Sequence, residues 1–457
     1  MRYLSGLDWV IASLDRAMKN RGSAGHSSQI VMVLDSIPDE AALRAGLAEF
    51  AGNFPVLRGR VARNWLNLAP YWETTAGRAS PTLRVHGADG PVGGDQSALG
   101  DELEEIANAR FENDWEHLAF DLVRGNDGKA LFIMRFDHRL FDARGAGLYL
   151  EYLGRFLGGN RMPPDPGPRA TEAPSGLTGW VKKFAAGKTV NRRMIALSGT
   201  PSRRLPELRA LAEPTQALRP QRRAQRNVAP GRPRVMARFL PVTFDRATTA
   251  RILDDAHARA GALMEMPYLL AAVIQSVHGL FAGKNIPGGG YVVPVTVDTR
   301  SPGDPVAEVF FNYASFLFFQ AKDGDIPDRD ALIRTIKGQM YDQVKEELPA
   351  KLAEVNYLMR IVPLSALGWL MNRFMGGRTW SFTFGYRGKP SYTSLQFMGA
   401  PVSGVFHLPR VPAPPGLGVF FDVFDGRMNA VLSWHDGVMD NGEARALVRD
   451  IAARLGS

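Results

Sequence analysis

The residues with the clearest chemical potential are a histidine and an aspartate four positions apart, His138 and Asp142. They follow an almost continuous apolar run at 130–136 and precede a helical pattern at 145–157. A histidine can take up a proton near neutral pH, and a neighbouring carboxylate can fix the surroundings of that histidine. The pair therefore predicts general-base chemistry at His138, of the kind that acyl transfer requires.

The same spacing occurs a second time in the chain, at His117 and Asp121. Because a histidine and an aspartate at this spacing are a weak signal alone, the surrounding pattern has to separate the two pairs. Asp121 falls within the strand predicted at 118–123, whereas His138 follows a buried strand, where side chains can reach into a cleft. We take His138 as the catalytic candidate; the alternative is a structural histidine at a strand end.

Alternating strands and helices must position this pair. Apolar runs of strand type and apolar residues at helical spacing distinguish the two kinds of element. In the first half they predict strands at 30–34, 118–123 and 130–136 and helices at 38–54, 103–111 and 145–157. In the second half they predict strands at 236–242, 291–297, 310–319 and 378–384, a hairpin at 416–434, and helices at 245–260, 266–281, 329–347 and 442–455.

Length and composition bound the architecture. The chain has 457 residues, of which 45% are hydrophobic, enough for more than one sizeable core. Prolines at 162–168 and the loss of apolar periodicity after residue 157 mark a break between two ordered parts. We predict an α/β (α+β) protein with an N-terminal domain at 1–157, a basic Pro/Arg-rich connector at 158–234 and a C-terminal domain at 235–457.

Several features are expected to be absent. The chain has no cysteine, which excludes disulfides, thiolate zinc sites and a cysteine nucleophile. We assign no metal site, because His407, His435 and Asp436 lack ligand spacing. We expect neither a signal peptide nor a membrane span, because neither an N-terminal basic-apolar segment nor about 18 uncharged apolar residues in a row occur.

The positive charge is concentrated in one segment. The net charge is +9, and residues 201–238 contribute +8 of it through ten arginines and two glutamates. A nucleic-acid-binding fold would carry its basic residues more evenly, so we expect no nucleic-acid partner. Three roles remain for the connector: a solvated linker, a surface for coenzyme A phosphates or an acidic acyl carrier protein, or a contact to anionic lipid. Trp180, Lys182, Lys183 and Phe184 would assist the lipid contact.

Around His138 the chain resembles the superfamily of His-x-x-x-Asp acyltransferases, which includes chloramphenicol acetyltransferase-like enzymes, wax ester synthases and condensation domains. The family motif is usually His-His-x-x-x-Asp-Gly; here Asp137 and Ala143 replace the first histidine and the glycine. Other segments with family-like sequence follow in the family's order, at 4–8, 54–58, 293–300, 311–312 and 381–385.

The resemblance implies two chloramphenicol acetyltransferase-like domains in a pseudo-dimeric V with a central tunnel, and His138 at its middle. Donor and acceptor would enter from opposite ends. In the family, the aspartate of the motif is architectural; by this analogy Asp142 points away from substrate and pairs with Arg300. Direct transfer between donor and acceptor also agrees with the missing cysteine, because it needs no acyl-enzyme.

A tetrahedral intermediate needs a hydrogen-bond donor. Strand alternation places Ser381 and Thr383 on one face and the three aromatic residues between 380 and 384 on the other. Either hydroxyl is therefore a candidate for stabilising the oxyanion, with ordinary strand residues as the alternative. Asn312 and Asp137 are further candidates for the tunnel lining.

The sequence thus predicts a bacterial-type acyltransferase, moving an acyl group from acyl-CoA or an acyl-carrier phosphopantetheine to a hydroxyl or an amine. No permanently bound cofactor is expected. We expect a cytoplasmic monomer, with a peripheral membrane contact if the connector binds lipid. The alternatives are a free-standing condensation domain that forms amides, and a degenerate, non-catalytic member that only binds an acyl group or a partner.

Overall fold

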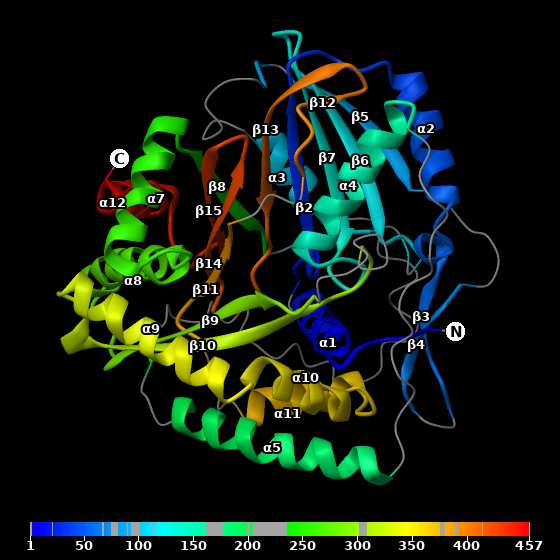
Figure 1. Cartoon of the computed structure of the whole chain (residues 1–457). Coiled ribbons are helices and arrows are strands. Elements are labelled where there is room, and N and C mark those ends of the chain that lie inside the picture. The colour runs from blue at the N-terminus through cyan, green and yellow to red at the C-terminus, as the bar shows by residue number, and fades with distance from the viewer. Residues whose placement is uncertain are drawn as a thin grey trace.

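The computed structural model describes residues 2–20, 22–65, 68–74, 81–88, 90–92, 101–111, 113, 115–160, 177–198, 202–203, 235–300, 309–374, 380–388, 392–413 and 415–456. In this part of the chain the strands form two six-stranded sheets and a three-stranded sheet (Figure 1). The two large sheets lie side by side, and helices cover their outer faces. This is the mixed α/β architecture that the alternating patterns predict.

The first large sheet has the strand order β12-β13-β2-β7-β6-β5. Its strands are β2 (Ser27–Leu34), β5 (Thr82–Gly87), β6 (Leu118–Arg124), β7 (Ala130–Asp137), β12 (Gln396–Phe397) and β13 (Ala400–Leu408). β6 and β7, which correspond to the strands predicted at 118–123 and 130–136, pair antiparallel. The helices α2 (Glu40–Gly52) and α4 (Ala143–Leu157) bury their apolar stripes in the core on one face of this sheet.

Strand β13 comes from the second half of the chain but completes the first sheet. It pairs antiparallel with β2, so that His407 lies opposite Ile30. Figure 1 shows β13 running beside β2, on the side of the first sheet that faces the second sheet. The two halves are therefore joined by backbone hydrogen bonds as well as by side-chain packing.

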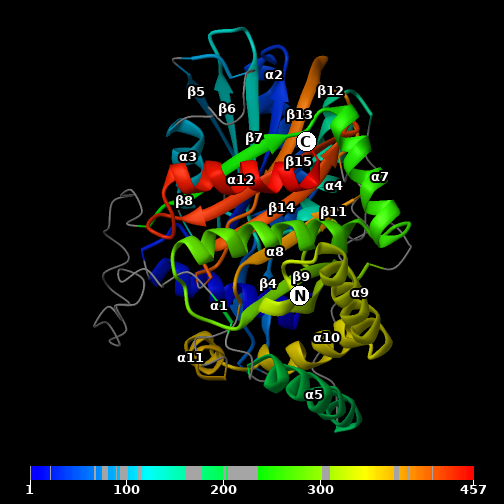
Figure 2. The same cartoon turned by 90° about the vertical axis from the view of Figure 1, so that its left-hand side faces the viewer.

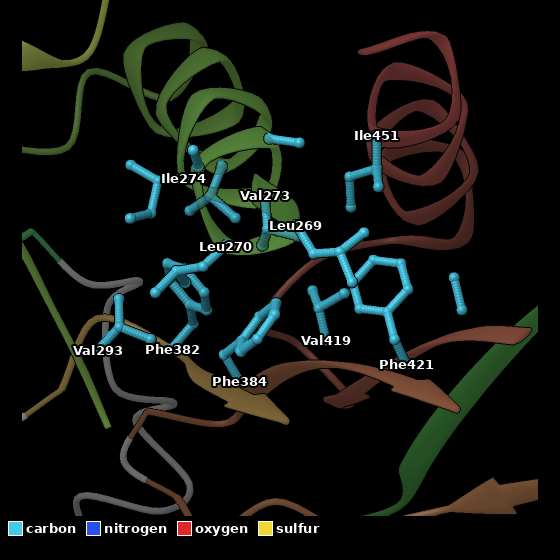
Figure 3. Close-up of a cluster of buried hydrophobic side chains, with 14 of the residues drawn as sticks. Leu269, Leu270, Val273, Ile274, Val293, Phe382, Phe384, Val419, Phe421 and Ile451 are labelled. Atoms are coloured by element: carbon cyan, nitrogen blue, oxygen red, sulfur yellow. The ribbon is translucent and has the colours of Figure 1, made fainter. Parts of the chain in front are cut away.

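The second large sheet has the order β10-β9-β11-β14-β15-β8. Its strands are β8 (Ala237–Thr243), β9 (Gly290–Asp298), β10 (Ala314–Lys322), β11 (Thr383–Arg387), β14 (Leu417–Phe424) and β15 (Arg427–His435). The helices α7 (Arg246–Ala260), α8 (Glu265–Gly283), α9 (Arg329–Lys345) and α12 (Asn441–Leu455) accompany it. Figure 3 shows α8 and α12 directing leucine, valine and isoleucine side chains at Phe384 and Phe421 of the sheet.

Helix α8 is long and apolar enough to span a membrane by composition, with 61% of its most apolar window buried inside the protein. Its residues from Tyr268 to Ile274 form the centre of the second core. This placement accounts for its hydrophobicity as that of a core helix.

The remaining elements lie around the two halves. They are β1 (Arg2–Tyr3), α1 (Gly6–Asn20), the short 3₁₀ helices η1 (Pro55–Arg58) and η5 (Asp323–Asp325), β3 (Arg60–Arg63), β4 (Pro70–Glu73), α3 (Asp101–Asn108), α5 (Leu177–Ser198), α10 (Leu348–Met359) and α11 (Leu364–Phe374). Helix α1 packs against α10 and α11, and the Trp9 indole donates to the Val362 carbonyl at 2.8 Å. The N-terminal helix therefore rests on the second half of the chain.

Two predicted strands begin later than the sequence indicates. The strand predicted at 310–319 starts at Ala314, because Phe310 and Phe311 instead insert into the core of the first half. The strand predicted at 378–384 is β11, which starts at Thr383. Phe310 and Phe311 thus contact the first half of the chain, whereas Trp380 and Phe382 pack within the second.

Part of the predicted connector is ordered structure. The helix α5 packs on α10, with Val190 and Leu197 in a shared cluster with Leu348. Of the ten arginines at 201–238, Arg203 pairs with Asp323 and Arg238 pairs with Glu104 and Asp436, so these two belong to the fold. The other eight lie outside the described residues.

Candidate functional site

The candidate base, His138, lies in the turn between β7 and α4, as its position after an apolar strand predicts. Its side chain is half-buried. Its Nδ1 is 3.2 Å from Asn312 Oδ1, and among the described residues no hydrogen-bond partner is found for Nε2. The imidazole is thus held at one nitrogen.

Asn312 links this histidine to the N-terminal helix. Its Nδ2 donates to Asp8 Oδ1 at 2.8 Å and to the His138 carbonyl at 2.8 Å. Both partners only accept, so the amide must present its Oδ1 to the histidine. An amide oxygen also only accepts, so His138 Nδ1 carries the proton and Nε2 holds the free lone pair. The network therefore selects the tautomer in which Nε2 can act as a base.

The backbone before Asn312 is strained. Phe311 has φ of 79°, a left-handed conformation that is costly for a bulky residue. The Phe311 amide donates to the Leu140 carbonyl at 2.7 Å, and its ring lies 5.8 Å from that of Trp72. The chain holds this conformation next to the residue that contacts the base.

A second histidine lies against the first. The rings of His26 and His138 are stacked, with centroids 4.7 Å apart and planes at 19°. Burial, followed by the charges of His138 and Arg410, keeps the pKa of His26 well below its ordinary value, so the ring is neutral at pH 7. A neutral ring supports His138 by packing and places no positive charge against it.

Asp137, a predicted candidate for the tunnel lining, takes part in a network of charged side chains next to His138. Its carboxylate is buried, is ion-paired with Arg139 and lies 3.4 Å from His117 Nδ1. Burial alone would raise the pKa of Asp137, but Arg139 and His117 hold it well below its ordinary value. These contacts fix the turn on both sides of His138.

The alternative pair, His117 and Asp121, is structural. His117 Nε2 lies 2.9 Å from the Gly59 carbonyl, and the side chain is 1% exposed. The Asp121 carboxylate is paired with His86 and with Arg135. Both members are satisfied by other groups, and no described contact joins them, which supports the choice of His138.

Asp142 and Arg300 are brought together as the resemblance implies. Arg300 Nη2 donates to Asp142 Oδ1 at 2.7 Å, and Arg300 also pairs with Asp298. The Asp142 carboxylate caps α4 by accepting from Gly145 N and accepts from Tyr313 N at 2.9 Å. Burial alone would lower the pKa of Arg300, but Asp142 and Asp298 outweigh it and raise the pKa above its ordinary value.

A glycine is required beside this ion pair. A Cβ atom at Gly145 would lie 2.1 Å from the Val309 carbonyl oxygen and 3.3 Å from Arg300 Nη2. The family motif has its glycine directly after the aspartate, where this chain has Ala143. Here the close approach between the two halves occurs two residues later.

The two candidate hydroxyls, on Ser381 and Thr383, lie in different surroundings. Ser381 is 1% exposed, and its Oγ accepts from Val292 N at 3.1 Å, so it belongs to the junction with β9. Thr383 is half-buried on β11. It shares a strand face with Arg387, whose Nη1 donates to the Ala143 carbonyl at 2.7 Å. Thr383 therefore lies on the face of β11 that meets the first half; no described contact joins either hydroxyl to His138.

The predicted alternation of the aromatic residues next to them is wrong. Trp380 stacks on Phe318 at 5.4 Å, in the cluster beneath α5. Phe382 and Phe384 lie in the core beneath α8. Alternation fails because regular strand structure begins only at Thr383.

Two residues of the site are not predicted individually from the sequence, although Asp8 ends the family-like segment at 4–8. Asp8 is a buried residue of α1 whose carboxylate also accepts from Ser5 N, as a helix cap does. His26 precedes an ordinary apolar strand. Only the packing of the two halves shows that they adjoin His138. Within the described residues, no cluster of histidine and carboxylate side chains could hold a metal ion.

Acid is expected to destabilise the fold through buried neutral histidines. Burial lowers the pKa of His435 to about 4, and burial followed by neighbouring charges lowers the pKa of His26 and of His407. The unfolded chain binds these protons near pH 6.5, so stability is complete above that pH and falls as the pH drops towards 4. For His435 alone the loss across this window is on the order of 3 kcal/mol.

Urea unfolding at a series of pH values between 7 and 4.5 measures this slope. A His435→Gln variant removes one titrating group and should flatten the slope, whatever its stability at pH 7. An unchanged slope would show that His435 does not remain neutral in the folded protein.

No protein-family model matches the chain, and no curated protein matches it. Solved structures match over its whole length. The first condensation domain of the CDA synthetase has a TM-score of 0.66 and 14% identity, covering 100% of this chain and 97% of that one. The trichothecene 15-O-acetyltransferase from Fusarium sporotrichioides has a TM-score of 0.65 and 12% identity. The match covers 100% of this chain and 95% of that one.

A third match is the starter condensation domain of rhizomide synthetase in complex with C8-CoA, with a TM-score of 0.60, 14% identity and coverage of 100% and 95%. At these identities the matches show a common fold. The chain has the fold of condensation domains and of this acetyltransferase, as the resemblance in sequence implies.

Proposed function

We propose, from the fold that it shares with condensation domains and an O-acetyltransferase, that this chain transfers an acyl group from a thioester to a nucleophilic acceptor. The donor is acyl-CoA or an acyl chain on a carrier-protein phosphopantetheine, and the acceptor is a hydroxyl or an amine. His138 is the general base. The observation that carries the proposal is the hydrogen-bond network that leaves His138 Nε2 with the free lone pair.

In the proposed reaction, Nε2 removes the proton from the acceptor as its oxygen or nitrogen attacks the thioester carbonyl carbon. The resulting tetrahedral intermediate collapses, the bond to sulfur breaks, and the imidazolium returns the proton to the departing thiolate. The products are the acylated acceptor and a free thiol, and His138 is neutral again. No covalent enzyme intermediate is needed.

Thr383 is the proposed donor to the oxyanion. Its hydroxyl lies on the face of β11 that meets the first half. Gly385 and Arg387 lie on the same strand face. Ser381 is less suited, because its side chain is buried at the junction with β9, where it accepts from Val292 N. A preorganised donor of this kind stabilises the negative charge that develops on the carbonyl oxygen.

Two of the similar structures bear on donor and acceptor. The rhizomide synthetase domain forms a complex with C8-CoA, and the Fusarium enzyme is named for acetylation at oxygen. They support a CoA thioester as donor and a hydroxyl as acceptor here. The amide-forming alternative is supported by the condensation domains among the matches. We favour the catalytic function over the non-catalytic alternative, because the contacts of Asn312 are consistent with a free lone pair on His138 Nε2.

Free-thiol release from acyl-CoA donors of different chain length tests the proposal. We expect release to depend on an alcohol or amine acceptor and mass spectrometry to identify the matching ester or amide. Carrier-bound donors are tested in parallel. A broad panel that yields no acceptor-dependent release would contradict the proposed activity and favour the binding role.

Replacing Asn312 tests the proposed selection of the tautomer. Asn312→Ala should lower kcat by about 30-fold with little change in KM, because it removes the acceptor for Nδ1–H and leaves the base misaligned. Asn312→Asp should move the acid limb of the kcat profile to higher pH, because a carboxylate beside Nδ1 favours the imidazolium.

The pH profile distinguishes this role from a structural one. A variant that only loosens the fold lowers activity without moving the acid limb. If Asn312→Asp leaves the limb in place, or if Asn312→Ala acts mainly on KM, Asn312 does not set the protonation of His138.

A further inference from the structure

Helix α5 turns a mixed apolar and basic face outward. The outer face of α5 consists of Val181, Phe184, Lys188, Arg192 and Ile195, which fall on one side of the helix and are all exposed. Val181, Phe184 and Ile195 are 68%, 62% and 62% exposed. Such large apolar side chains normally lie inside a protein, so three on one helix face indicate a contact surface.

The opposite side of the helix fixes this orientation. Ala186, Val190 and Leu197 are buried, and the last two share a cluster with Leu348 and Leu352 of α10. The helix is thus already anchored by one apolar side. The exposed apolar residues of the outer face lie on the side of α5 opposite to this packing.

The charge of α5 has a single sign. The helix carries Lys182, Lys183, Lys188, Arg192 and Arg193 and no acidic residue. Lys182 and Lys183 pair with Glu354. Arg192 Nη2 lies 3.8 Å from Glu346 Oε1, but 74% of the Arg192 side chain remains exposed. In sequence, α5 is followed by a segment at 204–234 with eight arginines and two glutamates.

We propose that the outer face of α5 docks on the surface of an anionic membrane. Apolar residues inserted at the headgroup boundary, flanked by lysine and arginine, characterise helices that lie in a membrane interface. Basic side chains at this depth extend their charged ends towards the lipid phosphates. The proposal is independent of the reaction at His138.

The spacing of the residues favours a flat partner over an acidic protein. Val181 and Ile195 stand about 21 Å apart along the helix, with Lys188 and Arg192 between them. An acidic protein would be expected to meet charges clustered at one place, whereas a membrane contacts the whole length of a helix. In both views α5 is the outermost helix at its end of the molecule, beyond α10 (Figures 1 and 2).

Sedimentation of the full chain with vesicles tests the proposal. We expect binding to vesicles of phosphatidylcholine with roughly 30% phosphatidylglycerol, at least tenfold weaker binding to pure phosphatidylcholine, and weakening by added salt. Phe184→Asp should reduce binding to the anionic vesicles by at least tenfold. Lys188→Gln combined with Arg192→Gln should reduce it by about tenfold.

The matched control is Leu263→Asp. Leu263 is 85% exposed, lies outside α5 and has φ of 60°, which aspartate tolerates, so the change in charge and apolar surface is comparable. This variant should bind within twofold of the unaltered protein.

Equal effects of Phe184→Asp and Leu263→Asp, or no binding to anionic vesicles, would overturn the proposal. Binding to an acidic acyl carrier protein that is lost in Phe184→Asp, without vesicle binding, would assign the face to a protein partner and would also overturn it. Thiol release with a soluble short-chain donor is measured on the same samples, so that a failure of the proposed reaction is recognised separately.

Discussion

Replacing His138 by alanine is expected to lower kcat for thioester cleavage by about 10³-fold, within the range that a general base contributes. The expectation follows from the geometry of its two nitrogens. Nδ1 is held by Asn312, and the Nε2 lone pair has no partner among the described residues, so it is placed to accept the proton of the acceptor substrate. KM should change little, because the side chain acts on the reacting proton and not on the remainder of the substrates.

His257→Ala provides the control for this variant. His257 is a partly exposed histidine on α7 that pairs with Glu265, and its loss should leave turnover within about twofold. Circular dichroism and thermal unfolding of both variants establish that the fold is retained. If His138→Ala kept more than a tenth of the activity, a different group or bulk water would have to accept the proton.

Replacing Asp142 by alanine is expected to lower the free energy of unfolding more than any other single substitution proposed for this protein. Asp142 is buried and accepts hydrogen bonds from Arg300, Gly145 N and Tyr313 N. Removing the carboxylate takes from the buried Arg300 the shorter of its two described ion pairs and removes the cap of α4. Breaking a buried ion pair from one side costs about 3–5 kcal/mol. The turn that carries His138 would also shift, so activity should fall with stability.

Asp298→Ala is the matched comparison, because Asp298 pairs with the same arginine but its side chain is 33% exposed. Its loss should cost no more than about 1 kcal/mol, as for other partly solvated pairs. Urea unfolding followed by tryptophan fluorescence measures both variants. The double change Asp142→Ala with Arg300→Met should recover part of the loss, since no unpaired buried charge remains. Equal costs for Asp142→Ala and Asp298→Ala would contradict this role of Asp142.

The parts of the fold that the sequence predicts well are those whose signals are local. The hairpin of β6 and β7 and the helix α4 appear as apolar runs with a turn between them, and the structure confirms them. Strand β13 was not predicted. It contains a register shift between Val402 and Gly404, which interrupts the alternation, and its partner β2 lies at the other end of the chain.

The candidate site likewise contains residues with a local signal in the sequence and residues without one. His138 and Asp142 are predicted from their spacing and from the strand before them, and the family resemblance implies the contact of Asp142 with Arg300 that the structure contains. Asn312 was placed near the tunnel, but its amide is taken up by His138 and Asp8. His26 and Asp8 were not singled out, because stacking and hydrogen bonding between distant segments leave no periodic trace in the sequence.

The position of β13 has a consequence for the synthesis of the chain. Residue 30 cannot find residue 407 until nearly all of the protein has left the ribosome. At about 5–20 residues per second, the β2 edge remains unpaired for roughly tens of seconds. Such an edge is a template for pairing with other chains. Nascent chains of this protein should therefore depend on chaperones until β13 emerges, and fragments that end before β13 should aggregate.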